Sequence, residues 1–407
     1  MIVELLLGGA AWIGAEYLKE GHTDKQRLDR IFRKCGLYVK YNQKEDTPKL
    51  LRTKKATDHT EYVYRLPEGL TFTDFKKKKE AIESSLNGSK EGFKLTNIKN
   101  VDVNKGLKQN IKRIANGETY KKEVLLSYDT TLKVKVYNQP LTNLLPYENN
   151  CKGWTVPIGV TRDKEIKHDF DKIMHMVVAG TTRYGKSIFL KTAITTLVSN
   201  QPDNALFTLI DLKGGLTFSR YSKCPQIQGI ASDAEQALER LETINVQMDG
   251  VMSYLKEGGY ENVQEASIKV RHFVIIDEGA ELAPGIEKDK ELRQIKNQCE
   301  VILSRIARIG GALGYRLIYA TQTPYSEVLN HNIKQNCDAK LCFKLQTDKA
   351  SEVVLGEGIT DAAHLPFIKG RGVYLTDRKH IVQTPMIDNK YIEGVVEHAS
   401  KNSGNGQ

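Results

Sequence analysis

Residues Gly180–Ser187 read G-T-T-R-Y-G-K-S, and this stretch decides the fold. It fits the phosphate-binding loop G-x-x-x-x-G-K-[ST], in which backbone N–H groups surround the phosphates of a nucleotide. In that pattern Lys186 reaches the β- and γ-phosphate oxygens, and the Ser187 hydroxyl binds Mg²⁺. The alternative is a glycine turn that holds a lysine by chance. The flanking sequence disfavours that alternative.

The loop lies between a predicted strand and a predicted helix. Residues 175–179 ahead of it read H-M-V-V-A, an apolar run typical of a buried strand, and residues 188–198 behind it have helical apolar spacing. A phosphate site uses this arrangement because a helix N-terminus presents free N–H groups and a positive dipole end. We therefore predict that ATP contacts nine consecutive residues: Gly180, Thr181, Thr182, Arg183, Tyr184, Gly185, Lys186, Ser187 and Ile188.

Three further apolar runs follow the loop, and each ends in polar residues. The runs are 206–210, ending at Asp211; 273–276, ending at Asp277-Glu278; and 316–320, ending at Thr321-Gln322. Strands alternate with helices from Gly153 onward, which predicts an α/β domain with a mostly parallel sheet. Ligands of such sheets bind at the carboxyl ends of the strands.

The polar strand ends carry the predicted chemistry. Asp277 would hold the Mg²⁺ that bridges the β- and γ-phosphates, and Glu278 would orient and deprotonate the attacking water. Gln322 would contact the water or the γ-phosphate, with a plain capping glutamine as the alternative. The lysine and glycines of D-L-K-G-G, residues 211–215, would line the pocket, meet a neighbouring subunit or form a simple turn.

These motifs together resemble the FtsK/SpoIIIE motor of the HerA/FtsK superfamily. They are H-x-x-x-A-G-T-T-x-x-G-K-S from His175, I-D-x-K from Ile210, I-D-E from Ile276, and an A-R-x-x-G stretch leading to A-T-Q. The resemblance covers about 154–385, and 60–145 is more weakly similar to the small domain that precedes this motor. It implies a RecA-like P-loop core, a hexameric ring and ATP-driven passage of double-stranded DNA. One departure is Arg183-Tyr184, where the family usually has Gly-Ser.

A ring ATPase is expected to use an arginine from a neighbouring subunit to stabilise the transition state. Arg308 in A-R-x-x-G is our first choice for this catalytic arginine, and Arg305 is the second. A surface salt bridge is the alternative role for each.

Composition and charge indicate the class of protein, the number of domains and the kind of partner. The chain has 407 residues, 40% of them hydrophobic and 27% charged, which is typical of a soluble protein with two or three domains. A formal charge of +10 makes a polyanion such as DNA a plausible partner. The six cysteines include no C-x-x-C pair, so we expect reduced thiols in a cytoplasmic protein, without a disulfide or metal site.

The sequence predicts four segments: an N-terminal helical segment at 1–45, a small basic α+β domain at 46–150, the motor at 151–396 and a disordered tail at 397–407. Residues 1–18 contain eleven apolar residues between two glutamates, fewer than the roughly 20 of a spanning helix. They are either a packed or partner-binding helix or a short membrane anchor.

Further elements are predicted as follows: helices at 23–35 and 72–86, strands at 62–66, 124–128 and 132–137, and a long helix whose capping box pairs Ser232 with Glu235.

Three functions remain open at this point. The first is an ATP-dependent double-stranded DNA translocase, most similar to the coupling ATPases of Gram-positive conjugative elements. The second is a nucleotide-gated adaptor that links a relaxase–DNA complex to a secretion channel. The third is another P-loop activity, such as phage or plasmid DNA packaging or a small-molecule kinase. Glu278 disfavours a purely structural nucleotide site, because binding alone needs no positioned base.

Overall fold

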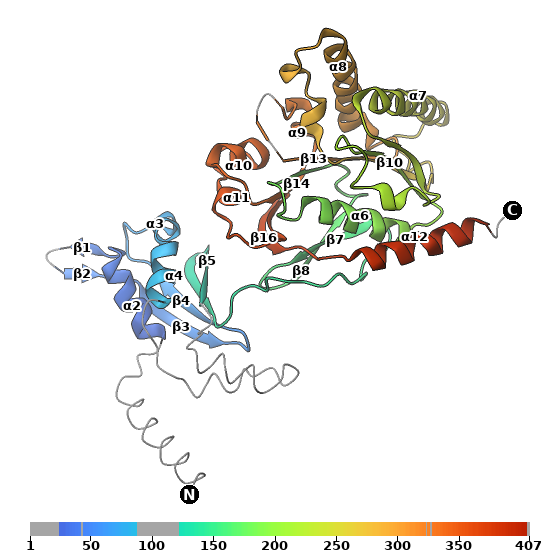
Figure 1. Cartoon of the computed structure of the whole chain (residues 1–407). Helices are drawn as coiled ribbons and strands as arrows, with labels where there is room; N and C mark the ends of the chain where they lie inside the picture. Colours follow the sequence, from blue (N-terminus) through green and yellow to red (C-terminus); the bar gives the residue numbers. More distant parts are fainter. Residues whose placement is uncertain (1–23, 42–43, 88–121, 323, 326–327, 405–407) are drawn as a thin grey trace, which may run out of the picture. The chain divides into compact units, whose positions relative to one another are not determined.

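A computed structural model describes residues 24–41, 44–87, 122–322, 324–325 and 328–404 (Figure 1). The chain forms two compact units, residues 1–140 and 141–407. The sequence-based grouping placed 141–150 with the small domain. These residues instead belong to the second unit, where the Tyr147 backbone N–H donates to the Met386 carbonyl at 3.1 Å. Residues 1–18, the predicted helix or membrane anchor, lie outside the described residues.

The first unit is a small α+β domain, as predicted. Its antiparallel sheet has the order β3-β4-β6-β5, and its helices pack on one core that contains Phe32, Tyr64 and Phe75. The helix predicted at 72–86 is divided at Lys78, whose φ of −100° and ψ of 4° interrupt the helix. The elements are α2 (Asp24–Lys34), β1 (Val39–Tyr41), β2 (Lys44–Asp46), β3 (Lys49–Lys55), β4 (His59–Arg65), α3 (Phe72–Lys77), α4 (Lys79–Asn87), β5 (Glu123–Asp129) and β6 (Thr131–Tyr137).

The second unit contains a ten-stranded sheet in the order β11-β10-β12-β13-β9-β14-β15-β16-β7-β8. The strands from β11 to β14 run parallel, and the pairings from β14 to β8 are antiparallel. This confirms the predicted mostly parallel sheet. The strands are β7 (Thr155–Val160), β8 (Glu165–Asp169), β9 (Met176–Ala179), β10 (Ala205–Ile210), β11 (Ile227–Ala231), β12 (Arg271–Ile276), β13 (Tyr315–Thr321), β14 (Ala339–Phe343), β15 (Arg371–Leu375) and β16 (Lys379–Gln383).

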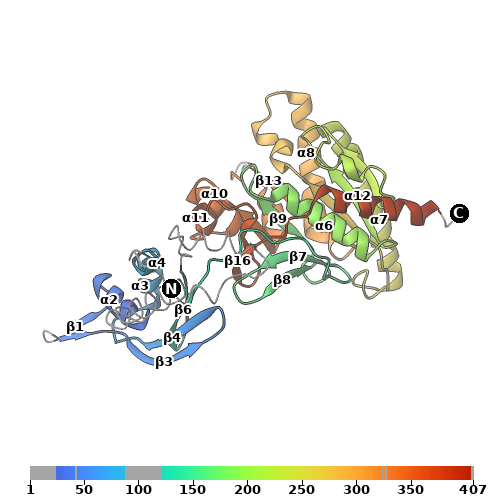
Figure 2. The same ribbon diagram turned by 60° about the horizontal axis from the view of Figure 1, so that its bottom comes forward.

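Helices cover both faces of the sheet (Figure 2). Because side chains alternate along a strand, Val177 and Ala179 of β9 enter one core while Met176 and Val178 enter the other. The first core packs against α7 (Ala234–Gly258), α8 (Lys290–Arg305), α9 (His331–Asn336), α10 (Asp348–Leu355) and α11 (Asp361–His364). The second packs against α6 (Lys186–Asn200) and α12 (Asn389–Gly404).

Two local predictions were wrong. The N-cap of α7 is Asp233, whose carboxylate accepts from the Gln236 backbone N–H at 2.8 Å, so the cap lies one residue after Ser232. The expected disordered tail begins inside a helix, because α12 continues to Gly404. Helical spacing brings Ala399 onto the same buried face as Ile392 and Val396, which explains the longer helix.

Among the described ranges, no helix has both the length and the apolar composition needed to cross a bilayer.

Candidate active site at the carboxyl ends of the parallel strands

The phosphate loop connects β9 to α6, and close packing requires its two glycines. A Cβ on Gly180 would lie 2.6 Å from the Phe343 Cβ, and one on Gly185 would lie 3.2 Å from the Gly370 Cα. The loop is also hydrogen-bonded to the strand beside it: the backbone N–H and the hydroxyl of Thr181 both donate to the Lys344 carbonyl, at 3.1 and 2.9 Å. β14 therefore supports the loop from one side.

Arg183 occupies an unusual backbone conformation within the loop. Its φ is 73°, in the left-handed region where a residue with a Cβ is strained by about 1–2 kcal/mol. The side chain is exposed at the rim of the loop. The position where the family usually has glycine thus keeps the glycine-type conformation in this chain.

Lys186, the first residue of α6, is buried between two acidic side chains. Its ammonium donates to the Asp277 carbonyl and to Asp277 Oδ1 at 2.9 Å, and it lies 3.6 Å from Glu278 Oε2. The three residues are 4%, 1% and 3% exposed. A nucleotide phosphate would have to draw the ammonium away from these carboxylates.

Asp277 and Ser187 supply a set of oxygens that fits Mg²⁺. The Ser187 hydroxyl donates to Asp277 Oδ1 at 3.3 Å, and the Thr217 hydroxyl donates to Asp277 Oδ2 at 3.0 Å. Mg²⁺ prefers hard oxygen ligands and is usually held by one or two carboxylates together with substrate phosphates and waters. A hydroxyl beside one carboxylate at a phosphate loop satisfies this requirement.

Glu278 follows β12 and has donors on both carboxylate oxygens. Oε1 accepts from the Thr321 hydroxyl at 2.9 Å and from the Gln322 backbone N–H at 2.8 Å. Oε2 accepts from the Lys213 ammonium at 3.2 Å. Sequence reasoning did not assign Lys213 to Glu278, although the two glycines after it signalled a tight turn that could direct the lysine back toward the site.

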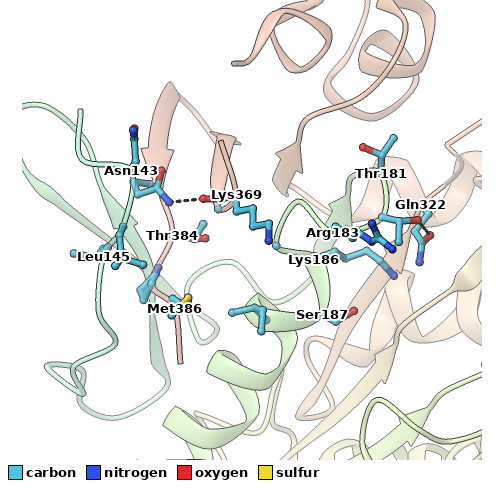
Figure 3. A pocket seen from close by; sticks show the side chains of 17 residues that line it. Asn143, Leu145, Thr181, Arg183, Lys186, Ser187, Gln322, Lys369, Thr384 and Met386 are labelled. Carbon is cyan, nitrogen blue, oxygen red and sulfur yellow. Dashed lines mark hydrogen bonds between the residues drawn. The ribbon is translucent and has the colours of Figure 1, made fainter. Parts of the chain in front are cut away.

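Gln322 touches the phosphate loop directly. Its Oε1 accepts from the Thr182 hydroxyl at 2.7 Å, so the side chain bridges the end of β13 and the loop (Figure 3). β13 lies between β9 and β12 in the sheet, and this order places Gln322 between the loop and Glu278.

A cavity of about 500 Å³ extends from the phosphate loop (Figure 3). Its volume is typical of a small-molecule site. Sequence reasoning missed the residues on its far side because they come from segments of the second unit that are distant from the loop in sequence: Asn143, Leu144, Leu145, Lys369, Gly370, Gln383, Thr384, Pro385 and Met386. The loop therefore adjoins a hollow large enough for the nucleoside part of a nucleotide.

The two candidate catalytic arginines differ in their partners. Arg305, at the end of α8, is bonded to Asn245 and Asp249 of α7. Arg308 lies in the π-helical turn Ile306–Gly310, is exposed, and lines a polar hollow with Asn330. Among the residues that the structure describes, neither arginine lines the cavity at the phosphate loop of its own chain.

Comparisons with known proteins found similarity to one family of ATPases. The FtsK/SpoIIIE family model matches residues 146–272. The chain is 32% identical over 215 residues to the DNA translocase FtsK of Helicobacter pylori J99, covering 50% of this chain and 24% of that protein. It is 27% identical over 253 residues to the corresponding protein of Leptospira interrogans, covering 57% and 25%. The chain thus spans about a quarter of the length of these curated relatives.

Two solved structures share the fold. The pCW3 conjugation coupling protein TcpA, in its monomer form with ATPγS, superposes with a TM-score of 0.61 at 22% identity and covers 91% of this chain and 98% of that one. The cytoplasmic domain of the type VII secretion ATPase EccC of Thermomonospora curvata gives 0.51 at 21% identity, covering 64% and 33%. The fold is therefore that of FtsK-like ATPases.

Proposed function

Residues 146–272 belong to the FtsK/SpoIIIE family of P-loop ATPases, and from that premise we propose that this protein hydrolyses ATP to move double-stranded DNA. One observation carries the proposal: Lys186, Ser187 and Asp277 meet at the end of β9 and β12, with Glu278 as the next residue. A phosphate-binding cation, a metal-binding pair and a carboxylate base are the groups that hydrolysis of a nucleoside triphosphate requires.

Each side chain has a defined task in this proposal. Lys186 leaves the carboxylates and binds the β- and γ-phosphates. Ser187 and Asp277 would hold Mg²⁺, which when bound would supply positive charge against the phosphate oxygens. Glu278 accepts a proton from the attacking water, and Gln322 orients that water or the γ-phosphate from its position beside Thr182.

We propose that the active form is a ring, with six subunits as in the resemblance to FtsK. Arg308 is exposed and lines a hollow with Asn330 instead of the cavity at the phosphate loop of its own chain, so its positive charge is available to a neighbouring active site. Arg305 is held by Asp249 and is the weaker candidate.

Double-stranded DNA is the proposed track, and transfer of a mobile or conjugative element is the proposed setting. The curated relatives are DNA translocases, and the net charge of +10 favours a polyanion. The similarity to TcpA, a conjugation coupling protein, extends over 91% of the chain and so includes the small unit. Because TcpA is a conjugation coupling protein, this extensive similarity also supports the second candidate function, an adaptor that couples a relaxase–DNA complex to a secretion channel.

The test is the ATPase rate of the full chain with and without long duplex DNA at low salt. A translocase is expected to be stimulated by duplex DNA and to displace a triplex-forming strand from it. Stimulation without strand displacement would favour the adaptor, and no stimulation would contradict both DNA functions. Glu278→Gln serves as the control that lacks hydrolysis.

We propose that the motor works in the cytoplasm, with 1–18 as the segment that could bring it to a membrane. Membrane fractionation of the full chain, beside a version that begins near Thr23, tests this location. Equal partition of the two forms would remove the anchor from consideration.

A further inference from the structure

Of the two lysines beside Glu278, Lys213 has no role in the function proposed above. Lys213 lies in the segment Asp211–Thr217 after β10, and its ammonium donates to Glu278 Oε2 at 3.2 Å. The ion pair has one buried and one accessible end, because the Glu278 side chain is 4% exposed and that of Lys213 is 39% exposed. An external ligand can therefore reach the lysine while the glutamate stays inside the site.

The backbone of the segment around Lys213 directs this side chain toward Glu278. Buried Asp211 accepts from the Lys213 backbone N–H at 3.3 Å and from the Thr217 backbone N–H at 2.6 Å. Between these two anchors Gly214 and Gly215 have φ values of 77° and 74°, a left-handed pair that other residues rarely adopt. A chain held at both ends and turned by two glycines places residue 213 reproducibly.

Hydrogen bonds to both of its oxygens restrain the carboxylate of Glu278. Thr321 and the Gln322 backbone N–H occupy Oε1, and Lys213 occupies Oε2, with the Lys186 ammonium 3.6 Å from the same oxygen. Charge-assisted hydrogen bonds are the stronger ones, so these donors hold the carboxylate in one orientation and occupy the positions where a water molecule would donate to it. When a phosphate draws Lys186 away, Lys213 remains as the cation that restrains Oε2.

We propose that Lys213 is a positioning residue that holds Glu278 in a low-activity state, and that the phosphates of double-stranded DNA release it. The exposed segment presents Lys213 to solvent beside Leu216, which is 78% exposed, and a polyanion competes with Glu278 for the ammonium. DNA binding would thereby leave Oε2 open to the attacking water. The inference rests on the proposed role of Glu278 as the base.

The kinetic test compares Lys213→Met with Lys213→Arg, which keeps the charge. Loss of a charge-assisted hydrogen bond corresponds to about a tenfold change in rate. Lys213→Met is expected to raise the DNA-free kcat about tenfold, to leave KM for ATP within twofold, and to lower the DNA stimulation ratio by the same factor. Lys213→Arg is expected to retain the low basal rate and the stimulation. Lys223→Met, which removes another exposed lysine nearby, is the matched control.

A lower DNA-free kcat in Lys213→Met, or an unchanged stimulation ratio, would overturn the proposal. If wild type is not stimulated by DNA, the proposed DNA function fails on its own, and the DNA-free rates still decide whether Lys213 restrains the base. Should Lys213→Met bind a fluorescent ATP analogue as wild type does, a lower rate cannot be assigned to misfolding.

A second measurement needs no nucleotide. Modification of lysine amines by an acetylating reagent, followed by mass spectrometry, is expected to be several-fold faster at Lys213 in Glu278→Gln than in wild type, since the ion pair is lost. Lys223 is the internal reference and should react equally in both. Equal reactivity of Lys213 in the two proteins would contradict the ion pair.

Discussion

At the scale of single residues, the candidate active site is a set of buried ion pairs between lysine ammonium groups and carboxylates. Lys186 is balanced by two carboxylates, and Glu278 is balanced by two ammonium groups, so removal of one partner leaves the other charged and buried. Removing one side of a buried ion pair costs about 3–5 kcal/mol, mainly because of the charge that remains. Substitutions here must therefore be assessed for folding as well as for activity.

The first prediction separates binding from hydrolysis. Lys186→Ala is expected to weaken ATP binding by about 10- to 100-fold, because a charge-assisted contact with the phosphates is lost. Glu278→Gln is expected to keep ATP affinity and to lose about 10²- to 10⁴-fold in kcat, since the base is absent. Equilibrium binding of a fluorescent analogue and steady-state rates measure the two effects. Lys172→Ala, at an exposed lysine, is the control, and an equal loss of affinity in both site variants would refute the assignment of Glu278.

The second prediction concerns Arg183, which adopts a φ of 73°. Arg183→Gly is expected to raise the free energy of unfolding by up to about 1 kcal/mol, because glycine adopts this conformation without a Cβ clash. The shift is measurable as a rise of a few degrees in the thermal midpoint. Thr182 does not have a positive φ, so Thr182→Gly relieves no backbone strain and should lower the thermal midpoint instead. A lower thermal midpoint in Arg183→Gly would show that the arginine side chain stabilises the folded protein by more than the strain of its backbone conformation destabilises it.

At the scale of elements, an ion-pair network joins three segments at the end of the sheet opposite the active site. Asp171, just after β8, accepts from Arg271 of β12 at 2.8 and 3.1 Å and from Arg316 of β13 at 2.7 Å. Arg316 is 1% exposed and depends on Asp171 for its charge partner. Burial alone would raise the pKa of Asp171, but the hydrogen bonds from both arginines outweigh it and hold this pKa below its usual value.

The third prediction follows from this network. Asp171→Asn is expected to destabilise the protein by about 3–5 kcal/mol at pH 7, because Arg316 stays buried without a carboxylate. A carboxylate with a lowered pKa in the folded state contributes its full stability above about pH 4 and loses it as the pH falls further. The difference in thermal midpoint between variant and wild type should therefore narrow below pH 4. Asp203→Asn, at an exposed aspartate, is the control, and a gap that is constant from pH 7 to pH 3 would contradict this account.

At the scale of the whole molecule, the second unit carries the candidate phosphate site, and the candidate catalytic arginine, Arg308, lies elsewhere on the same unit. Arg308 follows α8, while the phosphate loop precedes α6 on the other face of the sheet (Figure 1). A ring of identical subunits would bring the arginine of one copy to the loop of the next.

The fourth prediction tests this arrangement by mixing subunits. Arg308→Ala and Lys186→Ala are each expected to be inactive alone, while an equimolar mixture should regain part of the ATPase activity, since some sites then combine an intact loop with an intact arginine. Arg305→Ala should instead lower the thermal midpoint, because Arg305 is held by Asp249. If no mixing ratio restores activity, Arg308 does not act between subunits.

The sequence determined the strand–loop–helix unit around Lys186, the parallel strands and the acidic end of β12, because phosphate loops and buried strands are specified by local spacing. In the small domain it indicated β4, β5 and β6 but not β1, β2 or β3. It did not specify the Asp233 cap or the extension of α12 to Gly404, since several nearby residues could serve as the cap and the helix depends on packing against α6.

Only the tertiary structure decided which charges meet. Lys213 and Glu278 are 65 residues apart in sequence, and their contact depends on β10 and β12 being neighbours and on a glycine turn that directs the lysine back. The cavity beside the loop likewise combines 143–145 with 383–386, two segments of the second unit that are far apart in sequence. No local pattern encodes such pairs, because they arise from strand order and from packing between distant segments.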